Sequence, residues 1–157
     1  MSVNKVFNGN LSNLIPLNVS SWNNIQSGIQ WTKIITSQCK VTNNDVTAST
    51  YVNYNLYKCG NQMMIIFDNY LNFTTTGISQ NTPYLLNGLD LSNYAPSKKL
   101  FICYVGSGVE GNSGSQWYPV HVTISPQGVV SVQPAFYLDV AANNCAFYLG
   151  TITYLLL

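Results

Sequence analysis

The chain has 157 residues, of which 46% are hydrophobic, 13% aromatic and only 7% charged, and its formal net charge is +1. This length suits one domain whose core needs no disulfide framework, and so apolar a composition excludes an intrinsically disordered chain. Six lysines and no arginine cannot neutralise the phosphates that nucleic-acid binding engages, which leaves neutral ligands or proteins as partners.

The first thirty residues differ from the rest of the chain. No apolar run there or elsewhere is long enough for a secretory signal or a bilayer span, so we expect no membrane insertion. Residues 20–29 suit either a short helix capped by Ser20 or Ser21, or an extended segment. We interpret residues 1–30 as an N-terminal attachment segment and residues 31–157 as a head domain.

Strand patterns begin after Trp31. Residues 50–57 alternate, with Val52, Tyr54 and Leu56 on one face, and a turn at residues 60–61 predicts a hairpin. The return strand, residues 62–73, is apolar on both faces in its first half, which predicts a central position in the sheet.

The second half of the chain continues this pattern. Residues 100–105 form an apolar strand, and residues 106–116 form a glycine-rich surface loop. In residues 119–124 the alternation places His121 and Thr123 outward, and a turn at residues 125–128 leads into a strand over residues 129–132. A long strand over residues 146–155, apolar on both faces, closes the chain.

About eight strands with short turns and little helix predict an all-β fold, an antiparallel β-sandwich of jelly-roll-like or related topology. The outer face of a sandwich should be mostly polar, yet residues 63–70 and 147–156 are apolar on both faces. Self-association is the simplest cover for such surfaces, and we therefore expect a homo-oligomer.

Catalytic and metal-binding patterns are missing from the sequence. The five carboxylates are scattered singly, His121 is the single histidine, and the four cysteines are too far apart to make a zinc motif. We expect no enzyme activity, no catalytic residues, no metal and no cofactor, with the cysteines packed as small apolar side chains.

One cluster of residues has the composition of a sugar-binding site. A sugar ring can stack on an aromatic side chain while amides bind its hydroxyls, and the best candidates for this are Asn112, Gln116, Trp117 and Tyr118. The alternative is that Trp117 and Tyr118 only pack at the start of a strand.

A Trp-Thr start at residues 31–32 and four passages after it, in order, give the chain a resemblance to a known group of domains. The four passages are residues 57–62 (Tyr-Lys-Cys-Gly-Asn-Gln), 91–97 (Leu-Ser-Asn-Tyr-Ala-Pro-Ser), 122–130 (Val-Thr-Ile-Ser-Pro-Gln-Gly-Val-Val) and 152–154 (Ile-Thr-Tyr). The chain from residue 31 onward thus resembles the knob or head domains of bacteriophage tail fibres, head fibres and baseplate proteins. It departs from their pattern in having Gln127 where aspartate is commoner, and in a longer segment over residues 133–144.

This resemblance implies a virion structural protein, a homotrimer of β-sandwiches that attaches to a host surface or decorates a capsid or tail. It implies assembly in the host cytoplasm, contacts with other virion proteins through residues 1–30, and a host glycan or protein as a further partner. The competing interpretation is a free-standing carbohydrate-binding module.

Overall fold

The structure, a computed structural model, describes residues 30–77, 82–104, 119–135 and 142–156. The chain divides into two units, Met1–Trp31 and Thr32–Leu157, and the second unit contains every strand that the structure describes. The strands are β1 (Thr32–Thr42), β2 (Val46–Ser49), β3 (Val52–Cys59), β4 (Gln62–Phe67), β5 (Leu71–Thr75), β6 (Tyr84–Asp90), β7 (Leu100–Tyr104), β8 (Val120–Ile124), β9 (Val129–Pro134), β10 (Ala142–Phe147) and β11 (Thr151–Leu155). A 3-10 turn, η1 (Ser92–Tyr94), lies between β6 and β7.

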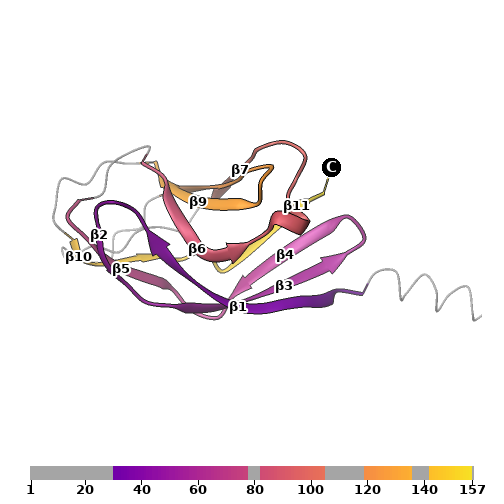
Figure 1. Cartoon of the computed structure of the whole chain (residues 1–157), viewed down its shortest axis with the longest axis horizontal. Coiled ribbons are helices and arrows are strands. Elements are labelled where there is room, and N and C mark those ends of the chain that lie inside the picture. Colours follow the sequence, from indigo (N-terminus) through magenta and orange to yellow (C-terminus); the bar gives the residue numbers. More distant parts are fainter. Residues whose placement is uncertain (1–29, 78–81, 105–118, 136–141, 157) are drawn as a thin grey trace, which may run out of the picture. The chain divides into compact units, whose positions relative to one another are not determined.

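These strands form two antiparallel sheets (Figure 1). The larger sheet has eight strands in the order β11-β4-β3-β1-β6-β9-β8-β7, and the smaller has the order β10-β5-β2. Strand β1 joins the two halves of the larger sheet, because its residues up to Cys39 pair with β3 while Lys40, Val41 and Thr42 pair with β6. The prediction of an all-β, antiparallel, sandwich-like fold is confirmed.

The β3–β4 hairpin forms as its sequence predicts. Val52, Tyr54 and Leu56 are buried, and Gly60 makes the turn with a φ of +56°, a left-handed conformation that favours glycine. Strand β4 lies between β3 and β11, so it is paired on both sides, although it is next to the edge strand and not at the centre of the sheet as predicted.

Two segments predicted as single long strands are each divided between the two sheets. Residues 62–73 become β4 and β5, separated by a turn, and residues 146–155 become the end of β10 and all of β11. At Gly150, where φ is +56°, the inward positions change from Phe147 and Leu149 to Ile152 and Tyr154. The apolar pattern on both faces of residues 147–156 therefore comes from this change of phase, and it does not indicate a covered outer face.

A second correction concerns Thr123, which the alternation placed outward among solvated groups. It is 4% exposed, and its hydroxyl is 2.6 Å from that of Ser131, its register partner on β9. Cross-strand hydroxyl pairs of this kind satisfy each other, which makes burial of two polar side chains tolerable. The helix alternative for residues 20–29 and the loop over residues 106–116 lie outside the described residues.

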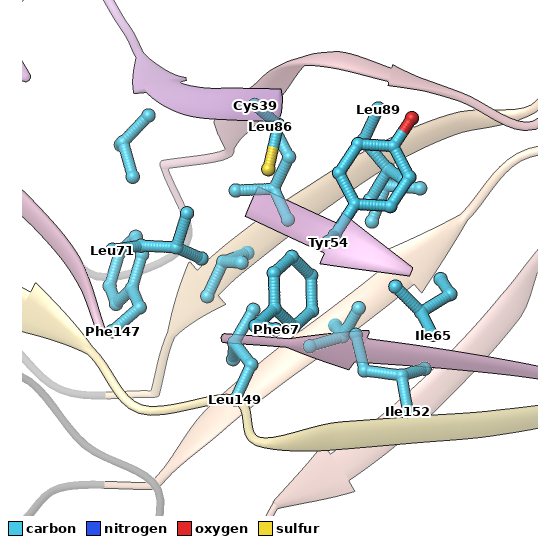
Figure 2. Packing of buried hydrophobic residues seen from close by; sticks show 14 of the residues in the cluster. Cys39, Tyr54, Ile65, Phe67, Leu71, Leu86, Leu89, Phe147, Leu149 and Ile152 are labelled. Atoms are coloured by element: carbon cyan, nitrogen blue, oxygen red, sulfur yellow. The ribbon is translucent and has the colours of Figure 1, made fainter. Parts of the chain in front are cut away.

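The inward faces of both sheets share one hydrophobic core, part of which Figure 2 shows. Phe147 of β10 is fully buried in it, with ring centroids 4.8 Å from Phe73 and 5.6 Å from Tyr84. Within the described part of the chain, every buried side-chain nitrogen and oxygen has a hydrogen-bond partner. The sandwich is thus a rigid scaffold on which surface features keep fixed positions.

Candidate functional site

The four residues singled out for sugar binding, Asn112, Gln116, Trp117 and Tyr118, lie outside the described residues. The described surface offers a different candidate, a depression beside β6 that we name the β6 groove. It consists of two hollows of about 530 and 450 Å³, and both are lined by Thr42 and Leu85. The first hollow is completed by Asn43, Asn44, Thr82 and Pro83, and the second by residues 86–90 and 127–130.

The groove forms because β6 bulges away from β9. Leu85 pairs with Ser131 and Asp90 with Val129, so β6 uses several more residues than β9 to cover the same distance. Gly88 lies in this bulge with a φ of +95°, and a Cβ there would overlap the Gln38 carbonyl of β1. The Gly88 carbonyl in turn accepts a hydrogen bond of 3.1 Å from the Tyr54 hydroxyl. Core packing therefore fixes the shape of the groove.

Several polar groups of the groove are already bound within the protein. The Asn43 amide donates to the Pro83 carbonyl at 2.9 Å and accepts from the Asp45 amide at 3.2 Å. The Thr42 hydroxyl donates a long bond of 3.4 Å to the Leu85 carbonyl. These bonds hold the β1–β2 turn against β6. The side chains of Thr42 and Asn43 therefore shape the first hollow.

The exposed amides are the side chains best placed for a ligand. Asn44, Asn87 and Gln127 are exposed at the groove, and Asp90 is the single charged residue among its lining residues. The backbone amide and the side chain of Ser92 hydrogen-bond to Asp90 and lower the pKa of its carboxyl group. Asp90 is therefore a hydrogen-bond acceptor at neutral pH.

Apolar groups separate these polar ones. Leu85 and Val129 are 44% and 50% exposed, and Pro83 is also exposed. Alternating aliphatic and amide groups with little charge suit a neutral, hydroxyl-rich ligand or an uncharged peptide. None of the described residues that line the two hollows is aromatic, so they give the groove no stacking surface for a sugar ring.

A smaller hollow of about 260 Å³ lies against the three-stranded sheet. It is lined by Ala48, Ser49, Thr50, Asn72, Phe73, Thr74 and Cys145. Burial raises the pKa of the Cys145 thiol to about 11, so this sulfur is protonated at neutral pH.

No arrangement typical of catalysis is found in the residues that the structure describes. No group of three or more His, Cys, Asp and Glu side chains there could hold a metal ion. His121 is half-buried on β8, with Cys103 of β7 and Gln133 of β9 as its register partners.

The four motifs that carry the phage resemblance meet at one end of the sandwich, on the right in Figure 1. The Leu156 amide donates to the Asn61 carbonyl at 2.7 Å, and the Tyr154 hydroxyl donates to the Tyr94 carbonyl at 2.8 Å. Gly128, with a φ of +80°, lies so close to the backbone of Leu91 that a Cβ would overlap it. The motifs therefore form packing contacts between strand ends, which is a structural role.

Among the described residues there is no helix long and apolar enough to cross a membrane. No protein-family model matches the sequence, and no curated protein matches it.

Proposed function

We propose that this chain is a virion structural protein, a phage fibre- or knob-like subunit mounted on the particle for host-surface attachment or for decoration of the capsid or tail. The observation that carries the proposal is the convergence of the four motifs at one end of an antiparallel sandwich. Passages that lie far apart in the chain resemble fibre-head sequences, and they are the passages that hold the strand ends together here, as in the hydrogen bond between Asn61 and Leu156.

The outward surface suits a structural subunit. On the face of β1 and β3, the Thr36 hydroxyl donates to the Asn55 side chain at 2.8 Å, and that amide donates to Asp68 at 3.1 Å. Beside them, the Gln38 amide donates to the Asn53 side chain at 2.9 Å. Such amide and hydroxyl ladders keep a surface hydrated without charge, so neutral partners are favoured over anionic polymers.

In this proposal residues 1–30 join the sandwich to other virion proteins, and the sandwich self-associates, as a trimer if the resemblance extends to assembly. Repetition of a weak surface site in such an oligomer would raise its avidity for a host glycan or protein.

The test uses particles purified from host cultures that carry the gene. Antibodies against the full chain should label a fixed position on the particle in immunogold electron microscopy, and a cryo-electron map should contain the sandwich there. A chain lacking residues 1–30 should fold and stay soluble but fail to incorporate. Recovery of the full chain in the particle-free fraction alone would contradict the proposal.

The competing function is a free-standing carbohydrate-binding module. Its supporting observation is the exposed amides and aliphatic groups of the β6 groove, although the described lining has no aromatic stacking surface. Neutral oligosaccharides would then shift the NMR signals of Asn87 and Gln127, and the Asn87→Ala and Leu85→Asp variants would lose binding. Gln62→Ala, at an exposed position on β4, is the matched control. The absence of shifts at millimolar oligosaccharide would exclude the groove, and Trp117→Ala would then test the site predicted from sequence.

A further inference from the structure

Strand β11 forms one edge of the eight-stranded sheet, and β4 is its single neighbour among the described strands (Figure 1). An edge strand presents backbone N–H and C=O groups that can pair with a strand of another chain. The pairing with β4 shows which groups these are.

Hydrogen-bonded and non-hydrogen-bonded positions alternate along an antiparallel pair. The Gly150 carbonyl accepts from the Phe67 amide at 3.0 Å, and the Leu156 amide donates to the Asn61 carbonyl at 2.7 Å. Even-numbered residues from 150 to 156 therefore bond to the β4 side, while Thr153 and Leu155 direct their N–H and C=O groups away from it. Within the described chain, no backbone hydrogen bond pairs these outward groups with another strand.

Proteins commonly protect a sheet edge with lysine, proline, a bulge or a covering segment. The opposite edge, β7, has such protection, since Pro96, Lys98 and Lys99 precede it and the Lys99 ammonium lies 4.9 Å from the ring centroid of Phe101. Residues 151–157 contain neither a charged side chain nor a proline. The two edges of one sheet therefore differ in the charged side chains and prolines that hinder strand addition.

We propose that β11 pairs with β11 of a second copy of this chain, antiparallel and across a two-fold axis at Tyr154. This register places Thr153 opposite Leu155 of the second copy on either side of the axis, so the outward N–H and C=O groups of both residues find partners. The Leu155 side chain, 44% exposed, then packs beside the Thr153 methyl group of the other copy.

A two-fold contact brings the same surface of both copies together, so that surface must be complementary to itself, and strand β11 meets this requirement. Antiparallel pairing keeps Ile152 and Tyr154 on the inward face in both copies. No like-charged side chains meet, because the segment contains no charged side chain. The contact gives even multiples of the chain mass, which distinguishes it from the three-fold contact that the phage resemblance implies. It does not depend on the proposed function.

The test compares two lysine substitutions in the full chain by sedimentation velocity over micromolar to millimolar concentrations. Leu155→Lys should raise the dissociation constant of the two-fold contact at least about tenfold, because it adds a charge at the edge and removes apolar contact. Phe101→Lys is the control, since it adds the same charge to the other edge at a residue that is 66% exposed. Equal effects of both variants, or a monomer throughout, would overturn the proposal.

Hydrogen exchange of the wild-type chain gives a second measurement that needs no variant. The amides of Thr153 and Leu155 should exchange rapidly in dilute protein and slowly in concentrated protein, while those of Ile152 and Tyr154 stay protected at both concentrations. Protection of Thr153 and Leu155 that does not depend on concentration would show that the edge is covered within one chain, and would overturn the proposal.

Discussion

The hydroxyl of Tyr154, on the last strand, donates a hydrogen bond of 2.8 Å to the backbone carbonyl of Tyr94 in the turn after β6. Tyr154 is 5% exposed, so the bond is formed away from most of the solvent. It ties the edge strand β11 to the connection between β6 and β7, two parts of the larger sheet that are not neighbours in its strand order.

Tyr154→Phe should lower the free energy of unfolding by about 1–3 kcal/mol, because the Tyr94 carbonyl loses its partner. Tyr51→Phe is the control; this ring is 60% exposed, and the change should stay within about 0.5 kcal/mol. Urea denaturation followed by tryptophan fluorescence measures both. Equal stability of the two variants would show that the bond contributes nothing.

Burial raises the pKa of Tyr154, and also that of Tyr54. The folded state therefore holds both hydroxyls protonated, and their contribution to stability is present below the ordinary tyrosine pKa of about 10 and is lost as the pH rises above it. Unfolding measured between pH 8 and 11 should show stability falling above about pH 10. The fall of stability with pH should be shallower in Tyr154→Phe. An unchanged slope would show that the Tyr154 hydroxyl does not contribute to the fall.

Gly128→Ala should destabilise the sandwich more than Gly60→Ala. Both glycines have a positive φ, which costs an alanine about 1–2 kcal/mol. A Cβ on Gly60 meets nothing within 4 Å, whereas one on Gly128 would overlap the backbone of Leu91 and Ser92, which adds about 1–3 kcal/mol of overpacking. Thermal unfolding of the two variants measures the difference, and equal melting temperatures would contradict it.

The hairpins could be predicted from the sequence because turn residues act locally. Gly60 and Gly128 each stand in a short turn between alternating segments, and both turns form as expected. The division of residues 146–155 between two sheets was missed, since Gly150 is the sole local signal and it interrupts a run that reads as one strand. Whether a strand continues or changes sheet depends on tertiary packing.

The candidate site was less predictable than the fold. The β6 groove depends on the bulge at Gly88, where φ is left-handed and the nearby β1 backbone leaves no room for a Cβ. The glycine in β6 was the available signal, because a glycine inside a strand marks a bulge or a close approach of another backbone. The sequence pattern wrongly placed Thr123 on the outward face for a similar reason. Its hydrogen-bond partner Ser131 becomes its neighbour only when β8 and β9 pair.

Thr123→Val should cost about 1–3 kcal/mol of stability, because it leaves the buried Ser131 hydroxyl without its partner. Adding Ser131→Ala should recover part of this loss, since removing both hydroxyls leaves no unsatisfied group. A double-mutant cycle in urea gives the coupling energy directly. Additive effects of the two substitutions would show that the 2.6 Å contact does not stabilise the fold.

Cys39 and Cys145 should resist alkylation in the folded protein. Burial raises their pKa values to about 12 and 11, so at pH 8 almost no thiolate, the reactive form, is present, and the two residues are only 0% and 1% exposed. Cys59, half-buried at the end of β3, is the internal reference, and iodoacetamide should label it before Cys39 and Cys145. Peptide mass spectrometry after timed labelling should show Cys39 and Cys145 reacting at the rate of global unfolding, with all three equal in urea. Labelling of Cys39 as fast as that of Cys59 in native protein would mean that the core opens locally around β1.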